Sequence, residues 1–198
     1  MIDIDPSIEE KFGRTALKPA RLRRFLVAAQ TEARLKGEVS VLLTGDTQIR
    51  QLNRNYRKKD KATDVLSFPA DEMGQAMGIA GDLAISVETA AREAESRGHA
   101  LVIELEVLLL HGALHLAGYD HEVDGGEMAR KEERLRKKLG LEVGLIARTL
   151  SPAVGKPGPT KKAVTKKSVV KKAAKKIAAK KVVPKKAVRK QAARSRVR

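Results

Sequence analysis

The segment from Leu101 to His121, LVIELEVLLLHGALHLAGYDH, constrains the fold more than any other part of the chain. Its apolar residues recur on all sides of a helix, which is typical of a helix buried in a protein core. A membrane-spanning helix needs about 20 predominantly apolar residues, and this segment contains two glutamates and three histidines. We therefore predict that residues 101–117 form a buried central helix and that Gly118 ends it.

The positive charge of the chain is concentrated in its last quarter. Residues 151–198 contain 18 Lys and Arg and no Asp or Glu, whereas residues 1–150 contain 23 basic and 24 acidic side chains. The last quarter also lacks aromatic residues and cannot bury enough apolar surface to fold alone. We predict one folded domain at 1–150 and a disordered basic tail at 151–198. The tail is expected to bind nucleic acid non-specifically through phosphates, although a solubilising extension without a dedicated partner fits the same composition.

Helix-like and strand-like segments alternate along residues 1–150 without a regular strand–helix–strand rhythm. This mixture predicts an α+β fold in which a small mixed β-sheet packs with helices. A loop is expected at 71–81, where three glycines interrupt any periodicity, and Asp46 is expected to cap a helix. Helices are predicted at 18–37, 46–56, 87–98, 101–117 and 125–140, the last of them exposed, and strands at 2–4, 38–45, 63–69 and 82–87.

Three of the four histidines lie at positions 111, 115 and 121. His111 and His115 are one turn apart on the same face of the predicted helix, and a turn at Gly118 would return His121 to the same point. Three neutral imidazoles leave one position of a tetrahedral zinc open, which is typical of a catalytic site. We predict one Zn²⁺ per chain bound by these three histidines, with nickel or cobalt as alternatives. Zinc lowers the pKa of bound water to about 7 and so supplies hydroxide at neutral pH.

The spacing HxxxHxxGxxH is also that of the metzincin proteases, which carry a general-base glutamate directly after the first histidine. Residue 112 of this chain is glycine, which cannot transfer a proton. A protease is therefore disfavoured, and either the base lies elsewhere or the metal acts with a different helper. The chain has no cysteine, which excludes Cys nucleophiles and thiolate zinc sites.

The histidine segment HGALHLAGYDH resembles the signature of the YbeY family of bacterial endoribonucleases. LNRNYRKKDKATDVLSFP (52–69) and GDLAIS (81–86) resemble the other two characteristic segments of that family in order and spacing. The resemblance extends over residues 1–145 and leaves the tail outside. It implies a compact α+β zinc domain with His111, His115 and His121 as zinc ligands and Arg57 as the main catalytic residue that is not a ligand. It also implies single-strand-specific RNA cleavage, 16S rRNA 3′-end maturation and ribosome quality control, with rRNA and the ribosome (30S or 70S) as partners.

An arginine suits the role that the resemblance implies for Arg57. A guanidinium does not act as a base at neutral pH, but it binds phosphate bidentately and stabilises negative charge in a transition state. The surrounding segment is basic and could follow an RNA backbone, although a solvated helix end explains each single cation equally well. The neighbouring cations are Arg50, Arg54, Lys58, Lys59 and Lys61.

Four further polar residues have open roles. Asp64, Ser67 and Asp82 lie at predicted strand ends, where they would either line the cleft or make local hydrogen bonds. Asp120 would either orient a ligand imidazole or stabilise the turn before His121.

Two other functions remain open beside the endoribonuclease. One is a zinc hydrolase of another class, such as a peptidase, and the other is a non-catalytic zinc-containing factor that binds the ribosome or nucleic acid. The acidic start MIDIDPSIEE lacks the basic and apolar regions of a secretory signal, so we expect a cytoplasmic protein without a membrane partner.

Overall fold

The computed structural model describes residues 1–141, and in them four strands form one sheet. The strands β1 (Ile2–Ile4), β2 (Glu38–Thr44), β3 (Val65–Pro69) and β4 (Ile79–Ser86) lie in the order β1-β2-β4-β3. β1, β2 and β4 are parallel, and β3 pairs antiparallel to β4 at the edge. The predicted small mixed sheet is therefore confirmed, including its short first strand.

Eight helices connect and cover these strands within the described part of the chain. They are α1 (Pro6–Phe12), α2 (Arg14–Leu17), α3 (Pro19–Ala33), α4 (Asp46–Arg57), α5 (Glu72–Ala76), α6 (Val87–Arg97), α7 (Leu101–Leu116) and α8 (Glu127–Lys138). The central helix predicted at 101–117 is α7. The mixture of these helices with the small sheet confirms the α+β class.

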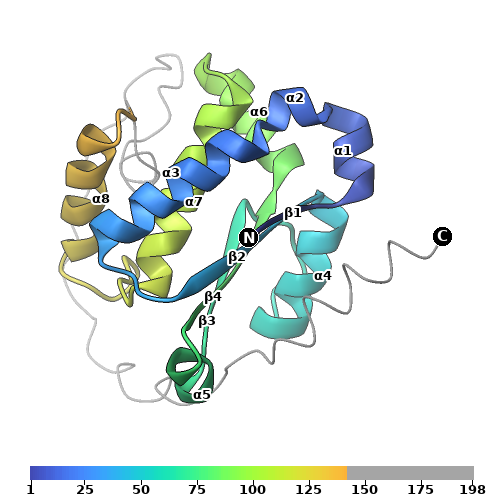
Figure 1. The fold of residues 1–198 in the computed structure, drawn as a ribbon. Coiled ribbons are helices and arrows are strands. Elements are labelled where there is room, and N and C mark those ends of the chain that lie inside the picture. Colours follow the sequence, from blue (N-terminus) through green and yellow to red (C-terminus); the bar gives the residue numbers. More distant parts are fainter. Residues whose placement is uncertain (142–198) are drawn as a thin grey trace, which may run out of the picture.

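The helices cover the two faces of the sheet unequally. Figure 1 shows α3 and α7 on one face together with α1, α2 and α6, while α4 lies on the other face. Alternation along β4 explains both layers, because neighbouring strand residues point to opposite faces. Leu83 and Ile85 belong to the large core with α3 and α7, and Ala84 between them belongs to a smaller core with Ile49 and Leu52 of α4.

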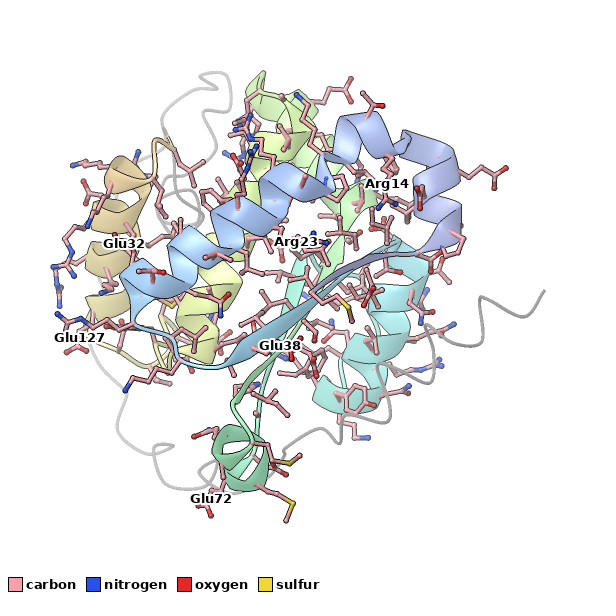
Figure 2. The ribbon with its side chains drawn as sticks, viewed as in Figure 1. Arg14, Arg23, Glu32, Glu38, Glu72 and Glu127 are labelled. Carbon is pink, nitrogen blue, oxygen red and sulfur yellow. The ribbon has the colours of Figure 1, made fainter. Side chains whose placement is uncertain are left out.

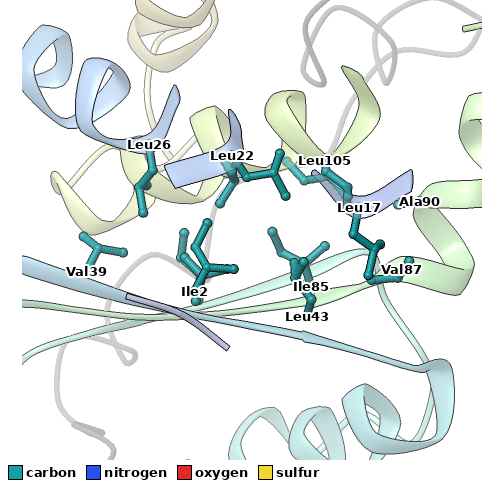
Figure 3. Close-up of a cluster of buried hydrophobic side chains, with 14 of the residues drawn as sticks. Ile2, Leu17, Leu22, Leu26, Val39, Leu43, Ile85, Val87, Ala90 and Leu105 are labelled. Carbon is teal, nitrogen blue, oxygen red and sulfur yellow. The ribbon is translucent and has the colours of Figure 1, made fainter. Parts of the chain in front are cut away.

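The large core is built around α7. Figure 3 shows Leu22 and Leu26 of α3 facing Leu43 and Ile85 of the sheet, with Leu105 of α7 beside them. Leu105 and its neighbours Leu108 and Leu109 have no exposed surface. Burying one such side chain contributes about 1.5–3 kcal/mol, so this helix is held firmly against the sheet.

Four local predictions need correction. Residues 72–76 form the short helix α5 because Asp71 accepts a hydrogen bond from the backbone of Gly74, which caps a segment predicted as a loop. α3 ends at Ala33 rather than near Gly37. Asp46 is the first residue of α4, and its carboxylate binds side chains of α6 instead of capping its own helix.

The fourth correction concerns α8, which was expected to be exposed. Its outer face is charged, but Met128, Glu132 and Leu135 are buried against the rest of the domain. α6 is capped at both ends, with Ser86 accepting from the backbone of Thr89 and Gly98 in the left-handed conformation.

No single helix among residues 1–141 is long and apolar enough to cross a membrane. α6 and α7 reach that length and composition only as a pair, across a bend of 116°. The predicted domain boundary at residue 150 and the basic tail at 151–198 lie outside the described residues.

Candidate metal centre

The three predicted histidines converge at the C-terminal end of α7. His111 and His115 lie on consecutive turns of one helix face, which then ends at Leu116. Gly118 follows in the left-handed region with φ of +90°, a conformation that glycine adopts without a steric penalty. The backbone N–H of Tyr119 donates to the carbonyl of Leu114 at 3.1 Å, which closes the turn that brings His121 back.

The spacing of the ring nitrogens fits one metal ion. One nitrogen of each of His111, His115 and His121 lies within 4.8 Å of the others. The Nε2 atoms of His111 and His115 are 3.1 Å apart. Two nitrogen ligands of a tetrahedral zinc lie about 3.3 Å apart, given Zn–N bonds of 2.0–2.1 Å. Among the described residues no further His, Cys, Asp or Glu joins the group, so it supplies three ligands.

Glu132 of α8 holds the innermost histidine. Its carboxylate lies 3.0 Å from Nδ1 of His111, and both side chains are buried. A carboxylate accepts a hydrogen bond from Nδ1–H, which leaves the Nε2 lone pair of His111 directed at the shared point. Sequence reasoning missed this residue because it predicted an exposed helix. The available signal was the apolar spacing of Met128 and Leu135, which places Glu132 on the buried face.

The environment of His115 favours the neutral form that binds metals. Burial lowers the pKa of His115, and electrostatic interactions with His111, His121 and the guanidinium of Arg57 lower it further, to about 4. Asp120 acts in the opposite direction but is outweighed. His115 is half-buried, so one side of the site remains open to solvent. Buried residues thus support the histidines on one side, and solvent reaches them from the other side, as a substrate-binding metal site requires.

Gly112 has a packing reason that the sequence did not reveal. A Cβ atom at this position would lie 2.8 Å from Cδ2 of Leu83 and 3.4 Å from the hydroxyl of Ser67. Residue 112 therefore faces the sheet, and its lack of a side chain lets α7 approach β3 and β4 closely. The position that carries the general base in metzincins cannot supply one here.

Arg57 reaches the same edge of the sheet from α4. It is the last residue of that helix and is exposed, and its guanidinium donates to the backbone oxygen of Ser67 on β3 at 3.4 Å. Its charge contributes to lowering the pKa of His115, so the structure places the two side chains in electrostatic reach of each other. The structure thus brings together the residues that the sequence grouped, from α4 and from α7.

The segment after Arg57 is held in place by Asn53. The amide of this buried side chain donates to the carbonyl of Lys61 at 2.8 Å, and its backbone oxygen accepts from Lys59. Of the predicted basic run, Arg50 makes an ion pair with Asp60 at 2.8 Å, so its charge is already neutralised. Arg54, Lys58, Lys59 and Lys61 are exposed.

The polar residues with open roles make mostly local contacts. Asp64 accepts from Thr63 and from the backbone of Val65. Asp120 accepts from the backbone N–H of Glu122 at 3.0 Å, which supports the turn, and its charge also acts on His115.

Ser67 is buried on β3, and Asp82 is half-buried on β4. The fourth histidine, His99, lies 2.7 Å from the buried carboxylate of Glu104.

Comparison with known proteins points to one family. The family model described as Endoribonuclease YbeY matches residues 10–140. A relative from Koribacter versatilis named Endoribonuclease YbeY is 52% identical over 132 residues, which cover 67% of this chain and 84% of the relative. Relatives of the same name from Solibacter usitatus and an Anaeromyxobacter species are 49% and 46% identical, covering 69% and 74% of this chain and 89% and 77% of their own lengths. The matched region contains α4, α7 and α8, which carry the candidate metal centre.

Proposed function

This chain belongs to the Endoribonuclease YbeY family, and from that premise we propose that it hydrolyses RNA at the three-histidine centre. The observation that carries the proposal is the convergence of three ring nitrogens within 4.8 Å, together with the exposed Arg57, whose charge acts on His115. The relatives carry the name of an RNA-cleaving enzyme. A phosphodiester is the substrate that a metal centre with a nearby guanidinium suits.

The metal is proposed to be Zn²⁺, one per chain, held by His111, His115 and His121. Three imidazoles and no thiolate suit zinc, and nickel or cobalt accept the same ligands. When bound there, zinc supplies Lewis acidity toward the phosphoryl oxygen and toward water. Glu132 keeps the Nδ1 proton on His111 and so presents its Nε2 to the ion.

Arg57 is proposed as the catalytic residue that is not a ligand. Its guanidinium can bind a phosphate oxygen with two N–H groups and stabilise the negative charge that grows as the P–O bond breaks. The contact with the Ser67 carbonyl holds the side chain against β3, and from there its charge acts on His115. Preorganised donors of this kind act because they do not need to reorient during the reaction.

The proposal is tested with purified full-length protein whose zinc content is measured and a labelled single-stranded RNA. We expect cleavage that a chelator abolishes and that zinc restores. Arg57→Ala should keep about one zinc per chain and lose most of the activity, by roughly 100-fold or more if one charge-stabilising donor is removed. Wild-type cleavage rates in that variant would refute the role of Arg57.

The same assay separates the two competing functions. A peptidase would cleave casein and leave RNA intact, and a non-catalytic zinc protein would bind RNA without cutting it in the presence or absence of chelator. Gly112 disfavours the peptidase, because its Cα faces Leu83 and offers no base.

The substrate is proposed to be the 3′ end of 16S rRNA, with a role in ribosome quality control in the cytoplasm. Incubation with immature 16S rRNA, alone and in 30S particles, tests this assignment. Cleavage of unrelated single strands at the same rate as the 16S precursor would show a nuclease without this specificity.

The tail at 151–198 is proposed to bind nucleic acid non-specifically, because its 18 cations have no acidic neighbours in sequence. If about six of them neutralise phosphates on a single strand, log K falls with log[salt] at a slope near −4. Deleting these residues should weaken RNA binding and flatten that slope. An unchanged slope would favour a solubilising extension.

A further inference from the structure

A second basic surface lies apart from the Arg57 segment, in a groove beside the turn that leads to His121. The groove has a volume of about 1240 Å³ and runs between the end of α3, the start of β4 and α8. Leu116 to Tyr119, at the end of α7, close one side of it. We call it the α3–α8 groove. Figure 2 shows Glu32 of α3 beside α8, at one wall of this groove.

The charge of this groove is strongly one-sided. Its lining contains one carboxylate, Glu32, which makes a salt bridge with Lys138 at 2.8 Å. Five cations line the groove, namely Arg34, Lys36, Lys131, Arg134 and Lys138. Residues 1–150 as a whole contain nearly equal numbers of acidic and basic side chains, so average composition does not explain this concentration.

Most of these cations have no counter-ion among residues 1–141. Within residues 1–141, Arg34, Lys36 and Arg134 make no salt bridge. The ammonium of Lys131 donates to the backbone oxygen of Glu32 at 3.3 Å. Burial lowers the pKa of Lys131, and the nearby charges of Arg134 and Arg34 lower it further. Like charges gathered in one groove repel one another, and an external anion would relieve that repulsion.

The walls of the groove are held rigidly. Gln30 donates to the carbonyl of Gly37 at 2.9 Å, and Glu38 donates to Gly78 at 2.8 Å. A Cβ at Gly37 would lie 2.8 Å from the backbone nitrogen of Ala80, so the α3–β2 connection packs directly on β4. Arg34 and Lys36 therefore project from an ordered connection, which reduces the entropy lost when an anion binds.

α8 links this groove to the metal centre. At about 100° per residue, Lys131, Arg134 and Lys138 fall within about 60° of one another around the helix. Glu132, which holds His111, lies about 100° or more from each of them. On the other side, Gly118 and Tyr119 line the groove and His121 follows two residues later. One helix and one turn are thus shared by the groove and the candidate metal site.

We propose that the α3–α8 groove binds the sugar–phosphate backbone of a single-stranded RNA segment that flanks the bond cleaved at the histidines. The proposal rests on the proposed function and deepens it by assigning a second contact region to the substrate. Recognition is through phosphate charge, so it is independent of base sequence.

The test uses full-length protein carrying His115→Ala, with chelator, so that the RNA stays intact during binding. The groove variant is Arg34→Glu with Arg134→Glu, two exposed side chains without salt bridges. The matched control is Arg23→Glu with Arg24→Glu on α3, which makes the same charge change outside the groove. Thermal unfolding of both variants verifies that they fold.

Fluorescence anisotropy with a labelled, unstructured 20-nucleotide RNA should show at least 10-fold weaker binding for the groove variant. The control should stay within about 2-fold of the parent. Loss of two phosphate contacts should also reduce the slope of log K against log[salt] by about 1.4. Equal affinities of the groove and control variants would overturn the proposal, and so would groove-dependent binding of a poly-glutamate peptide without groove-dependent binding of RNA.

Crosslinking of RNA that contains 4-thiouridine gives an independent measure. We expect crosslinked peptides from 34–37 or 131–138, and crosslinks confined to other segments would overturn the assignment. Both readouts measure binding and not turnover. A wild-type protein that fails to cleave RNA but binds it through this groove would therefore refute only the proposed function, whereas cleavage without groove dependence would refute only the groove.

Discussion

The two halves of α7 both bury ionisable side chains, but they satisfy them in different ways. In the first half, Glu106 receives two hydrogen bonds from Arg21 at 2.7 and 2.8 Å, and Glu104 lies 2.7 Å from His99. In the second half, His111 has Glu132, but the Nε2 atoms of His111 and His115 face each other at 3.1 Å. Paired opposite charges stabilise a fold, whereas lone-pair donors gathered at one point need a cation from outside. We therefore propose that the first half of α7 is structural and that the second half binds the metal ion.

Removing one gathered donor should give the largest effect. In His115→Ala we expect zinc content to fall from about one per chain to near zero and RNA cleavage to fall by about 1000-fold or more, because two imidazoles do not retain the ion. The metal-free variant should unfold at nearly the same temperature as the metal-free parent. Metal analysis and a gel-based cleavage assay measure the outcome, and one zinc retained per chain would contradict the ligand assignment.

Removing the carboxylate behind the metal site should give the next largest effect. Glu132→Gln preserves the size of the side chain but removes its charge, so zinc affinity should fall by about 10- to 100-fold. Competition with a chromogenic chelator measures this affinity. The matched control is Glu133→Gln, one residue further along α8, whose carboxylate is exposed and pairs with Lys137. Equal zinc affinities of the two variants would show that Glu132 contributes to packing and not to zinc binding.

Local features of the site were predictable from sequence. The offsets of His111, His115 and His121 need only helix geometry and a glycine that tolerates a positive φ, and Gly118 has φ of +90°. The strands follow from their apolar, β-branched segments, and the burial of α7 follows from apolar residues on all sides of the helix. Such patterns depend only on residues that lie close together in the sequence.

Contacts between distant segments were not predictable from spacing. Glu132 reaches His111 across 21 residues, and Gly112 is small because Leu83 of another element lies against it. Asp46 was expected to cap its own helix, but its carboxylate instead accepts hydrogen bonds from the hydroxyls of Ser86, at the end of β4, and Thr89 of α6. Arg57 was assigned from a family resemblance, because its position relative to His115 depends on how α4 and α7 pack against opposite faces of the sheet.

Breaking a charge pair in the first half of α7 should change stability and not function. Glu106→Gln weakens the two hydrogen bonds from Arg21, and the free energy of unfolding should fall by about 1–2 kcal/mol, since Arg21 is partly exposed and can be hydrated. Zinc affinity should be unchanged. Glu93→Gln, which breaks the exposed ion pair with Arg97, should lower the free energy of unfolding by less than about 0.5 kcal/mol. A loss of zinc in Glu106→Gln would remove the proposed division of α7 into two halves.

Lowering the pH should destabilise the second half of α7 through His115, and this is the smallest effect that we expect. Its pKa in the folded protein is about 4, whereas a histidine in the unfolded chain titrates near 6.5. The unfolded state therefore binds more protons below pH 6.5, and stability is lost as the pH falls from 6.5 toward 4. After a discount for solvent screening at a half-exposed site, we expect a loss on the order of 1 kcal/mol.

Thermal unfolding of the metal-free protein between pH 7 and 4.5 measures this loss, and His115→Ala should show a shallower decline. Protonation of carboxylates such as Asp46 does not contribute to the stability loss in this pH range. Burial opposes the shift, but hydrogen bonds from Ser86, Thr89 and Arg92 lower the pKa of Asp46 below its usual value, so its contribution is lost only at lower pH. Equal slopes in the parent and in His115→Ala would show that the second half of α7 accepts protons as readily as an unfolded chain. His115 would then not be held neutral by its surroundings.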